Sequence, residues 1–223
     1  MAGTAENITR LLKELPSEVR LVAVSKTIHV SEILNAYRAG QRCFGENRVQ
    51  EMITKKENLP EDIEWHLIGH LQTNKVRQIV SFVNMIQSVD SFRLLSVINN
   101  EAVKVSRIVD CLFQIHIAEE ETKFGFSLRE LEGVVGSQEF ISLKNVRICG
   151  VMGMATFTND EAQIRKEFRY LADCFESMKN RFFIEVPHFR EISMGMSGDY
   201  KIAVEEGSTM VRIGSHIFGE RST

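Results

Sequence analysis

The stretch 20–39, RLVAVSKTIHVSEILNAYRA, contains one strand and one helix in succession. Its first five residues are almost wholly apolar, which is typical of a strand that is buried on both faces. A helix is expected over 30–39. A strand followed directly by a helix favours parallel pairing with the next strand, because parallel strands need a crossover connection.

The same alternation continues from this unit to both ends of the chain. An N-terminal helix that carries Ile8, Leu11, Leu12 and Leu15 on one face precedes it. The expected strands are 20–24, 43–45, 64–68, 84–89, 108–117, 146–154, 191–194 and 210–213. The expected helices after them are 30–39, 47–56, 74–81, 91–105, one starting after residue 127, 164–178, 200–206 and a final turn over 215–218. Two helix starts carry a capping box, a hydroxyl residue followed three positions later by glutamate: Ser127 with Glu130, and Thr158 with Glu161.

Eight strand-then-helix units predict an α/β fold, a single (β/α)8 TIM barrel over residues 1–223, since such barrels usually take about 250 residues. No proline-rich, serine-rich or charged tract is long enough to be an interdomain linker. An open, doubly wound sheet is the alternative. It is less favoured because no GxGxxG motif follows the first strand.

The composition argues against several protein classes. A net charge of −3 is unlike that of proteins that coat nucleic acid or anionic lipid. No apolar run approaches 18 residues and the first residues lack a signal-peptide pattern, so we expect neither a membrane span nor secretion. The four cysteines form no CxxC pair, which is typical of a reduced, cytoplasmic protein.

Lys26 is the first candidate functional residue. The functional site of a (β/α)8 barrel lies at the C-terminal ends of the strands, and Lys26 closes the first strand there. Burial favours the neutral amine, which can attack an aldehyde and form a Schiff base. The alternative is a lysine that simply extends from a strand end into solvent.

Two glycine-containing turns follow the last two expected strands. The turn GMSG (195–198) and the pair Gly214 and Ser215 can bring backbone amides and hydroxyls to an anion such as phosphate. Arg212 lies within the last strand, where a charge needs a partner. Plain turns and an internal salt bridge are the alternatives. Together, an amine, a phosphate cradle and a fixed cation match the aldehyde, phosphate and ring nitrogen of pyridoxal 5′-phosphate (PLP).

Six motifs around these residues resemble the YggS/PROSC family, whose single-domain members bind PLP and act in its homeostasis. The motifs are VAVSK (22–26), FGENRVQE (44–51), EWHLIGHLQTNK (64–75), KFG (123–125), GVMGMATF (150–157) and SMGMSGDY…GSTMVRIGSHIFGER (193–221). The resemblance implies the N-terminal barrel of alanine racemase, which is fold type III of the PLP proteins. It also implies that the C-terminal β-domain of that enzyme is missing.

The resemblance further assigns the cofactor-binding residues. It implies that Lys26 carries the internal aldimine, that Arg212 meets the pyridine nitrogen and that Asn47 contacts the cofactor. The residues expected to hold or adjoin the phosphate are Met196, Ser197, Gly214 and Ser215. Ser215 stands where many members of the family have threonine, and it keeps the hydroxyl.

A carrier or buffer of PLP, and not an enzyme, is what the resemblance implies. Alanine racemase-like enzymes use a catalytic tyrosine that a second domain of a partner subunit donates. Here Tyr37 and Tyr170 fall on expected outer helices, and Tyr200 near the mouth is expected to pack on a helix face. We therefore expect no catalytic residue, a monomer, and PLP-dependent apoenzymes as recipients. An amino-acid racemase or related PLP enzyme is the alternative, and a barrel that scaffolds another protein is a weaker third.

Neither a metal nor nucleic acid is expected as a ligand. His66 and His70 are four residues apart, but no HExxH motif includes them and they fall on a strand end and the following loop. His66 is expected to line the barrel mouth instead. The basic residues are scattered and not interleaved with aromatic ones, so nothing favours nucleic-acid binding.

Overall fold

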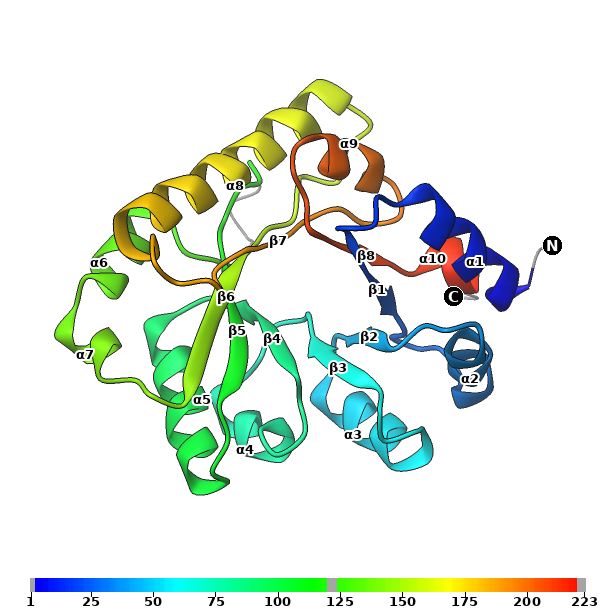
Figure 1. The fold of residues 1–223 in the computed structure, drawn as a ribbon, viewed down its shortest axis with the longest axis horizontal. Coiled ribbons are helices and arrows are strands. Elements are labelled where there is room, and N and C mark those ends of the chain that lie inside the picture. Colours follow the sequence, from blue (N-terminus) through cyan, green and yellow to red (C-terminus); the bar gives the residue numbers. More distant parts are fainter. Residues whose placement is uncertain (1–2, 120–123, 220–223) are drawn as a thin grey trace.

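Eight parallel strands close into a barrel in which each strand pairs with the next and β8 pairs with β1 (Figure 1). This computed structural model describes residues 3–119 and 124–219. The strands are β1 Arg20–Val24, β2 Cys43–Glu46, β3 Glu64–Leu67, β4 Met85–Val89, β5 Val109–Gln114, β6 Val146–Met152, β7 Glu191–Ser193 and β8 Met210–Ile213. The predicted barrel is confirmed, and the open-sheet alternative is wrong because the first and last strands are hydrogen-bonded.

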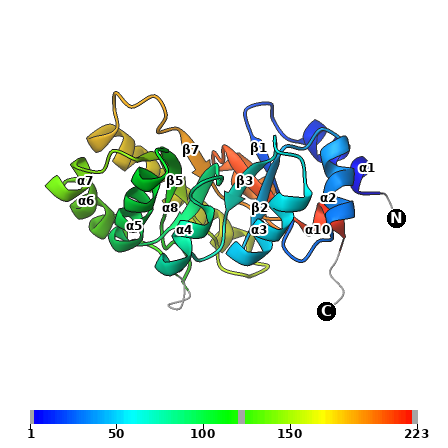
Figure 2. The ribbon, with the colours of Figure 1, turned by 90° about the horizontal axis from the view of Figure 1, so that it is seen from below.

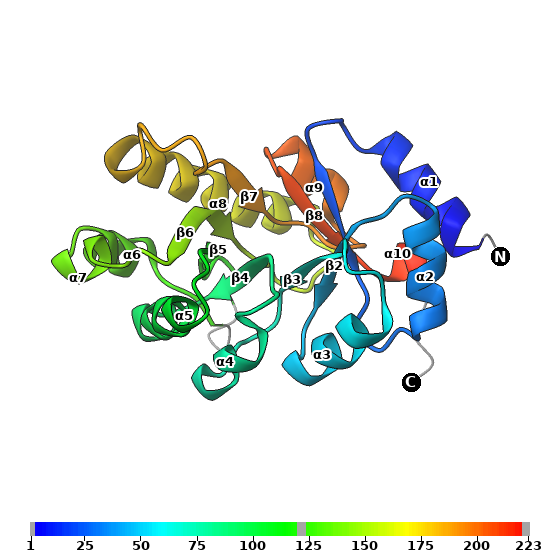
Figure 3. The ribbon, with the colours of Figure 1, turned by 60° about the horizontal axis from the view of Figure 1, so that its bottom comes forward.

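The helices lie outside this ring of strands (Figures 1 and 3). They are α1 Thr4–Glu14, α2 Val30–Arg38, α3 Val49–Asn58, α4 Val76–Ile79, α5 Phe92–Lys104, α6 Leu128–Val135, α7 Gln138–Ile141, α8 Glu161–Phe182, α9 Tyr200–Glu205 and α10 Ser215–Phe218, with a 3₁₀ turn η1 at Thr73–Lys75. The first and last helices lie side by side (Figure 2), and the Asn7 amide donates to the Ile217 carbonyl at 3.0 Å. No helix in the described ranges has the length and apolar character that a membrane crossing requires.

Apolar side chains form two layers because successive residues of a strand point to opposite faces. One set fills the barrel interior and consists of Val22, Cys43, Met85, Leu112, Cys149, Met152 and Met210. The larger set lies between the strands and the helices and includes Ala23, Phe44, Ile86, Phe113 and Val211. Burial on both faces explains why the strands read as short, nearly continuous apolar runs.

Several predicted details are wrong for local reasons. Leu12 is 47% exposed, because the buried face of α1 passes through Ile8 and Leu11 and is too narrow to include it. The helix predicted over 74–81 is instead η1 followed by the single turn of α4. The Ser127–Glu130 capping box is confirmed. At α8, however, Asp160 caps the helix by accepting from two backbone amides, while Thr158 accepts from the amide of Asp160.

Gly150 allows β6 to lie close against β7. Its φ is +151°, and a Cβ built on it would lie 1.8 Å from the carbonyl oxygen of Glu191. The register of β6 against β5 shifts at the same place, between Cys111 and Leu112. Because the obstacle is backbone in a paired strand, no side-chain rearrangement can relieve it, and only glycine fits at this position.

We expect Gly150→Ala to lower the free energy of unfolding by about 3 kcal/mol, since the substitution adds both a steric conflict and an unfavourable φ. Urea denaturation followed by circular dichroism measures the change. Gly133→Ala is the matched control, because Gly133 lies in α6 with no atom within 4 Å of an added Cβ. It should stabilise the protein by about 0.5–1 kcal/mol through helix propensity. Equal effects of the two substitutions would contradict this account.

Candidate functional site

The closure of the barrel brings the predicted site residues to one end. Strands β7, β8, β1 and β2 are consecutive neighbours, and all run in the same direction. Their C-terminal ends therefore meet at one mouth of the barrel. Lys26 and Asn47 follow β1 and β2, and the segments 195–198 and 214–215 follow β7 and β8. Segments that lie up to 189 positions apart in the sequence are thus adjacent in the structure.

Lys26 is half-buried and lies two residues beyond the end of β1. Val22 of the same strand belongs to the interior layer. Since side chains alternate along a strand, position 26 continues the series of positions that face the inside of the barrel. The amine is thus attached at the edge of the barrel interior, on the rim of the mouth.

A buried polar network fixes the backbone on both sides of Lys26. The Ser25 hydroxyl donates to Glu46 Oε1 at 2.6 Å, and Lys55 Nζ donates to the Ser25 carbonyl at 2.6 Å. The amide of Thr27 donates to Glu51 Oε1. Thr27 has φ +64°, a left-handed conformation that a β-branched residue adopts only where its surroundings impose it.

The Glu46–Lys55 ion pair is the centre of this network. Its atoms approach to 2.7 Å, and the two side chains are 0% and 6% exposed. Burial raises the pKa of the Glu46 carboxyl, and the ammonium of Lys55 opposes that rise. Glu46 was included in the quoted FGENRVQE motif, but neither Glu46 nor Lys55 was predicted to act at the site. A charged residue at the end of an otherwise apolar strand was the available signal.

Arg212 lies inside the barrel and is 4% exposed. Its Nη1 donates to Ser193 Oγ at 2.7 Å, and its Nη2 donates to the Gly153 carbonyl at 2.9 Å. Both acceptors are neutral. Burial lowers the pKa of Arg212 to about 10, and the carboxylate of Asp199 opposes this shift. The internal salt bridge considered for Arg212 is absent among the described residues, where no carboxylate forms an ion pair with it.

The hydrogen bonds of Arg212 continue through the barrel to His66. Ser193 Oγ donates to Gln87 Oε1 at 2.7 Å, and Gln87 Nε2 donates to His66 Nδ1 at 2.9 Å. His66 is 1% exposed, and burial, followed by the charge of Arg20, lowers its pKa to about 3. The expectation that His66 lines the mouth is therefore wrong, because the third residue of β3 points into the closed interior.

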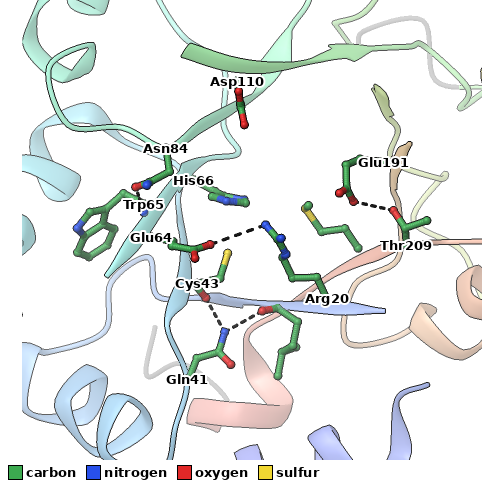
Figure 4. Close-up of polar contacts among 12 residues, drawn as sticks. Arg20, Gln41, Cys43, Glu64, Trp65, His66, Asn84, Asp110, Glu191 and Thr209 are labelled. Atoms are coloured by element: carbon green, nitrogen blue, oxygen red, sulfur yellow. Dashed lines mark hydrogen bonds and ion pairs between the residues drawn. The ribbon is translucent and has the colours of Figure 1, made fainter. Parts of the chain in front are cut away.

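A second cluster lies at the opposite end of the strands (Figure 4). Cys43 and Glu64 are the first residues of β2 and β3. Their sulfur and carboxylate atoms and a ring nitrogen of His66, which could together bind a metal ion, lie within 4.8 Å of one another. Arg20 enters the same cluster, with Nη1 3.7 Å from Glu64 Oε2. A guanidinium there disfavours a metal ion, and Gln87 already occupies one nitrogen of His66. His70 makes different contacts, with Asp90 at 2.9 Å and with the ring of Phe124.

The two turns predicted to hold a phosphate contact each other. The amide of Gly214 donates to Ser197 Oγ at 3.3 Å, and Asp199 Oδ1 accepts from the amide of Met196. Met196 is 36% exposed, and Ser215 is exposed at the start of α10. Gly195 is required here, because its φ is +94° and a Cβ on it would lie 2.6 Å from that of Ala203.

Asn47 is half-buried beside this mouth, and the turn after β3 presses against its backbone. A Cβ on Gly69 would lie 2.5 Å from the Asn47 carbonyl oxygen.

Tyr200 packs as predicted: its hydroxyl donates to Glu14 of α1 at 3.0 Å and its ring meets His216 edge-on. Lys123 of the KFG motif, and Glu220 and Arg221 at the end of the last motif, lie outside the described residues.

Comparison with known sequences gives consistent relatives. A family model described as "Alanine racemase, N-terminal domain" matches residues 2–222. The "Pyridoxal phosphate homeostasis protein" of Aquifex aeolicus (strain VF5) is 36% identical over 221 residues, which cover 99% of this chain and 90% of that protein. The protein of the same name from Escherichia coli (strain K12) is 36% identical over 210 residues, covering 92% and 87%.

Comparison with solved structures supports the same grouping. PipY of Synechococcus elongatus PCC7942, solved with PLP bound, has a TM-score of 0.87 and 35% identity, covering 97% of this chain and 100% of that one. Alanine racemase from Bacillus anthracis, solved with bound L-Ala-P, has a TM-score of 0.72 and 15% identity. It covers 99% of this chain, which spans 56% of the racemase. At this identity the racemase shows a shared fold alone.

The buried ion pair beside Lys26 gives a stability prediction. We expect Lys55→Met to lower the free energy of unfolding by about 3–5 kcal/mol, because it leaves the Glu46 carboxylate buried without its counter-charge. The double variant Glu46→Gln/Lys55→Met should lose less than the single one. Denaturant unfolding of the single and double variants measures both losses.

The control for this experiment is Lys104→Met, which removes an exposed ion pair with Glu101. It should change stability by less than about 0.5 kcal/mol. A loss in Lys55→Met no larger than that in Lys104→Met would show that the buried pair does not hold this part of the mouth.

Proposed function

This chain belongs to the family of pyridoxal phosphate homeostasis proteins, and from that premise we propose that it binds PLP reversibly at the barrel mouth and acts as a carrier or buffer of the cofactor. The aldehyde of PLP is bound covalently, through the amine of Lys26. Holding the aldehyde in this way limits its free concentration in the cell. We propose that residues 1–223 work as one PLP-binding barrel domain, as a monomer, in the cytoplasm.

The buried guanidinium of Arg212 is the observation that carries this proposal. A charge removed from water is costly unless a partner compensates it. Among the described residues Arg212 hydrogen-bonds only to a hydroxyl and a carbonyl, and the Asp199 carboxylate acts on it without forming an ion pair. A ligand with a lone pair at this depth and a negative charge nearby supplies the missing compensation. PLP has both, in its pyridine nitrogen and its phosphate, so the residues present fit the cofactor.

The remaining residues around the mouth match the other groups of PLP. Ser197, Gly214 and Ser215 supply hydroxyls and backbone amides for the phosphate, with Met196 beside them, and Asn47 contacts the cofactor from the position just after β2. The hydrogen bond from the Gly214 amide to Ser197 Oγ supports this role, because it brings two donors of the cradle together from different loops. Bound PLP supplies an aldehyde and an electron-accepting ring.

A carrier is favoured over a racemase by where the tyrosines lie. Racemisation requires an acid and a base on opposite faces of the cofactor, and Lys26 provides one of them. Tyr37 and Tyr200 donate their hydroxyls to Asp62 and Glu14, and Tyr170 is 42% exposed on α8. None of these contacts is with a residue of the mouth. Recipient proteins would be PLP-dependent apoenzymes whose own lysine displaces Lys26.

We expect purified protein with added PLP to show a yellow absorption band that borohydride bleaches, because reduction fixes the pyridoxyl group on Lys26. Peptide mapping after reduction locates the label. Lys26→Ala should lose the band and retain weaker, non-covalent binding through the phosphate cradle. Lys75→Ala, which removes an exposed lysine from the turn η1 after β3, serves as the control and should behave as the parent does.

Two outcomes would overturn the assignment of PLP to this site. One is equal absorbance of Lys26→Ala and the parent protein. The other is a label spread over surface lysines. In either case Ser197, Gly214 and Ser215 would belong to a site for a different phosphate compound.

In the part of the chain that the structure describes, no tyrosine is placed as a second acid or base beside Lys26, and this gives a separate prediction. In deuterated buffer, the PLP-loaded protein should exchange no Cα hydrogen of added amino acids over several hours, since among the described residues Lys26 has no tyrosine opposite it to complete an acid–base pair. Proton NMR of a panel of L- and D-amino acids measures the exchange, with an authentic alanine racemase as the positive control. Exchange of any one amino acid that Lys26→Ala abolishes would favour the enzyme alternative.

A further inference from the structure

We propose that Ser193 and Gln87 are positioning residues that hold Arg212 for the ring nitrogen of the bound cofactor, and thereby make the site select ligands with a hydrogen-bond acceptor at that place. This inference rests on the proposed function. Neither residue contacts the cofactor in this account, because both act through Arg212. They lie in β7 and β4, inside the barrel and beneath the mouth.

The chain of hydrogen bonds has a direction that Arg212 determines. A guanidinium only donates, so Ser193 Oγ accepts from Nη1 and turns its own proton toward Gln87 Oε1. The amide nitrogen of Gln87 then faces His66 Nδ1, which accepts. Neutral His66 therefore carries its proton on Nε2. Every proton between Arg212 and His66 has one assigned position, so the chain has no alternative arrangement of equal energy.

Two tethers fix the plane of the guanidinium. Nη1 is held by Ser193 and Nη2 by the Gly153 carbonyl, at 2.7 and 2.9 Å. The other N–H bonds of the planar group keep fixed directions, and these are the donors left for a ligand. Without Ser193, only the contact with Gly153 remains and the group can rotate about it. Without Gln87, the Ser193 hydroxyl loses its acceptor and can rotate. Its oxygen lone pair then no longer points steadily at Arg212 Nη1.

The position of these residues argues against simple filling of the barrel. Apolar side chains of the interior layer surround this part of the barrel, with Val22, Met85, Leu112 and Met152 as examples. Four polar side chains, buried to 5% exposure or less, cross this layer in one connected chain. Burying such groups costs stability unless each is satisfied, so an apolar interior would be the more stable choice for a purely structural barrel. The polar chain instead ends at Arg212, a charged group that the ligand would meet.

The test compares PLP with its 1-deaza analogue, in which a C–H replaces the ring nitrogen. Dissociation constants for both are measured in the parent, Ser193→Ala, Gln87→Leu and the conservative variant Ser193→Thr. Loss of a hydrogen bond to a charged group is worth about ten- to one hundred-fold in affinity. The parent should prefer PLP by about that factor. Ser193→Ala and Gln87→Leu should reduce the preference at least about three-fold, and Ser193→Thr should restore it.

The control variant is Thr209→Val, which removes hydrogen bonds to Ile192 and Glu191 at the other end of the same strand pair. It should leave the preference unchanged although it also costs stability. The affinity for inorganic phosphate should be the same in all variants, since the cradle is untouched. If Gln87→Leu fails to fold, Ser193→Ala with its Ser193→Thr rescue decides the question.

The outcomes separate this inference from the proposed function. If the parent protein fails to bind PLP at all, the proposed function is wrong. If it binds PLP covalently through Lys26 but shows no preference over the deaza analogue, the role of Arg212 is wrong and the inference is overturned with it. If the parent shows the preference and Ser193→Ala and Gln87→Leu keep it in full, the inference alone is overturned.

Discussion

The pairing of β8 with β1 is the constraint on which the rest of this molecule depends. It sets Val22 opposite Arg212 and closes the barrel, so the first and last strands share one interior and one rim. Lys26 and the turns around Ser197 and Gly214 belong to distant parts of the sequence. Only closure makes them neighbours, because in an open sheet β1 and β8 would not pair. The site is therefore a property of the closed ring and not of any single strand-helix unit.

Two polar networks hold the mouth from opposite sides of the barrel wall. Outside the wall, the Glu46–Lys55 pair fixes the backbone that carries Lys26. Inside it, Ser193, Gln87 and His66 support Arg212. Buried polar networks are rigid where their members are satisfied. In the outer network Glu46 Oε2 is the exception, since it is buried with no hydrogen-bond partner among the described residues. Both networks are placed where a ligand's position would be decided, which is the pattern of a preorganised binding site.

The comparison with alanine racemase shows how far fold and function are separable. The two barrels have a TM-score of 0.72 at only 15% identity, which shows a shared architecture and says nothing of shared chemistry. What a protein with this barrel does depends on particular side chains and not on the fold. Tyr200 follows the turn 195–198 in the sequence, but its hydroxyl donates to Glu14 on the outer helix α1, so this tyrosine serves packing.

The sequence by itself determined most of the elements and their approximate positions, with bounds that shift by one to four residues outside β1, β8 and α10. Strand β8 and helix α10 lie where periodicity predicts them, and the Ser127–Glu130 cap is confirmed, because each depends on residues within a few positions of one another. The motifs at strand ends also nominated candidate site residues, which the barrel brings to one mouth. The sequence did not predict that Asp160, and not Thr158, caps α8, since this depends on the exact path of the chain into the helix.

Only the tertiary structure decided which polar groups meet. Nothing local relates Gln87 to Ser193, or Lys55 to the carbonyl of Ser25, because these contacts cross between elements that closure and helix packing bring together. The same reason explains the error over His66. Its position in β3 was predicted correctly, but whether a side chain at that position reaches the mouth or the sealed interior depends on the other seven strands around it.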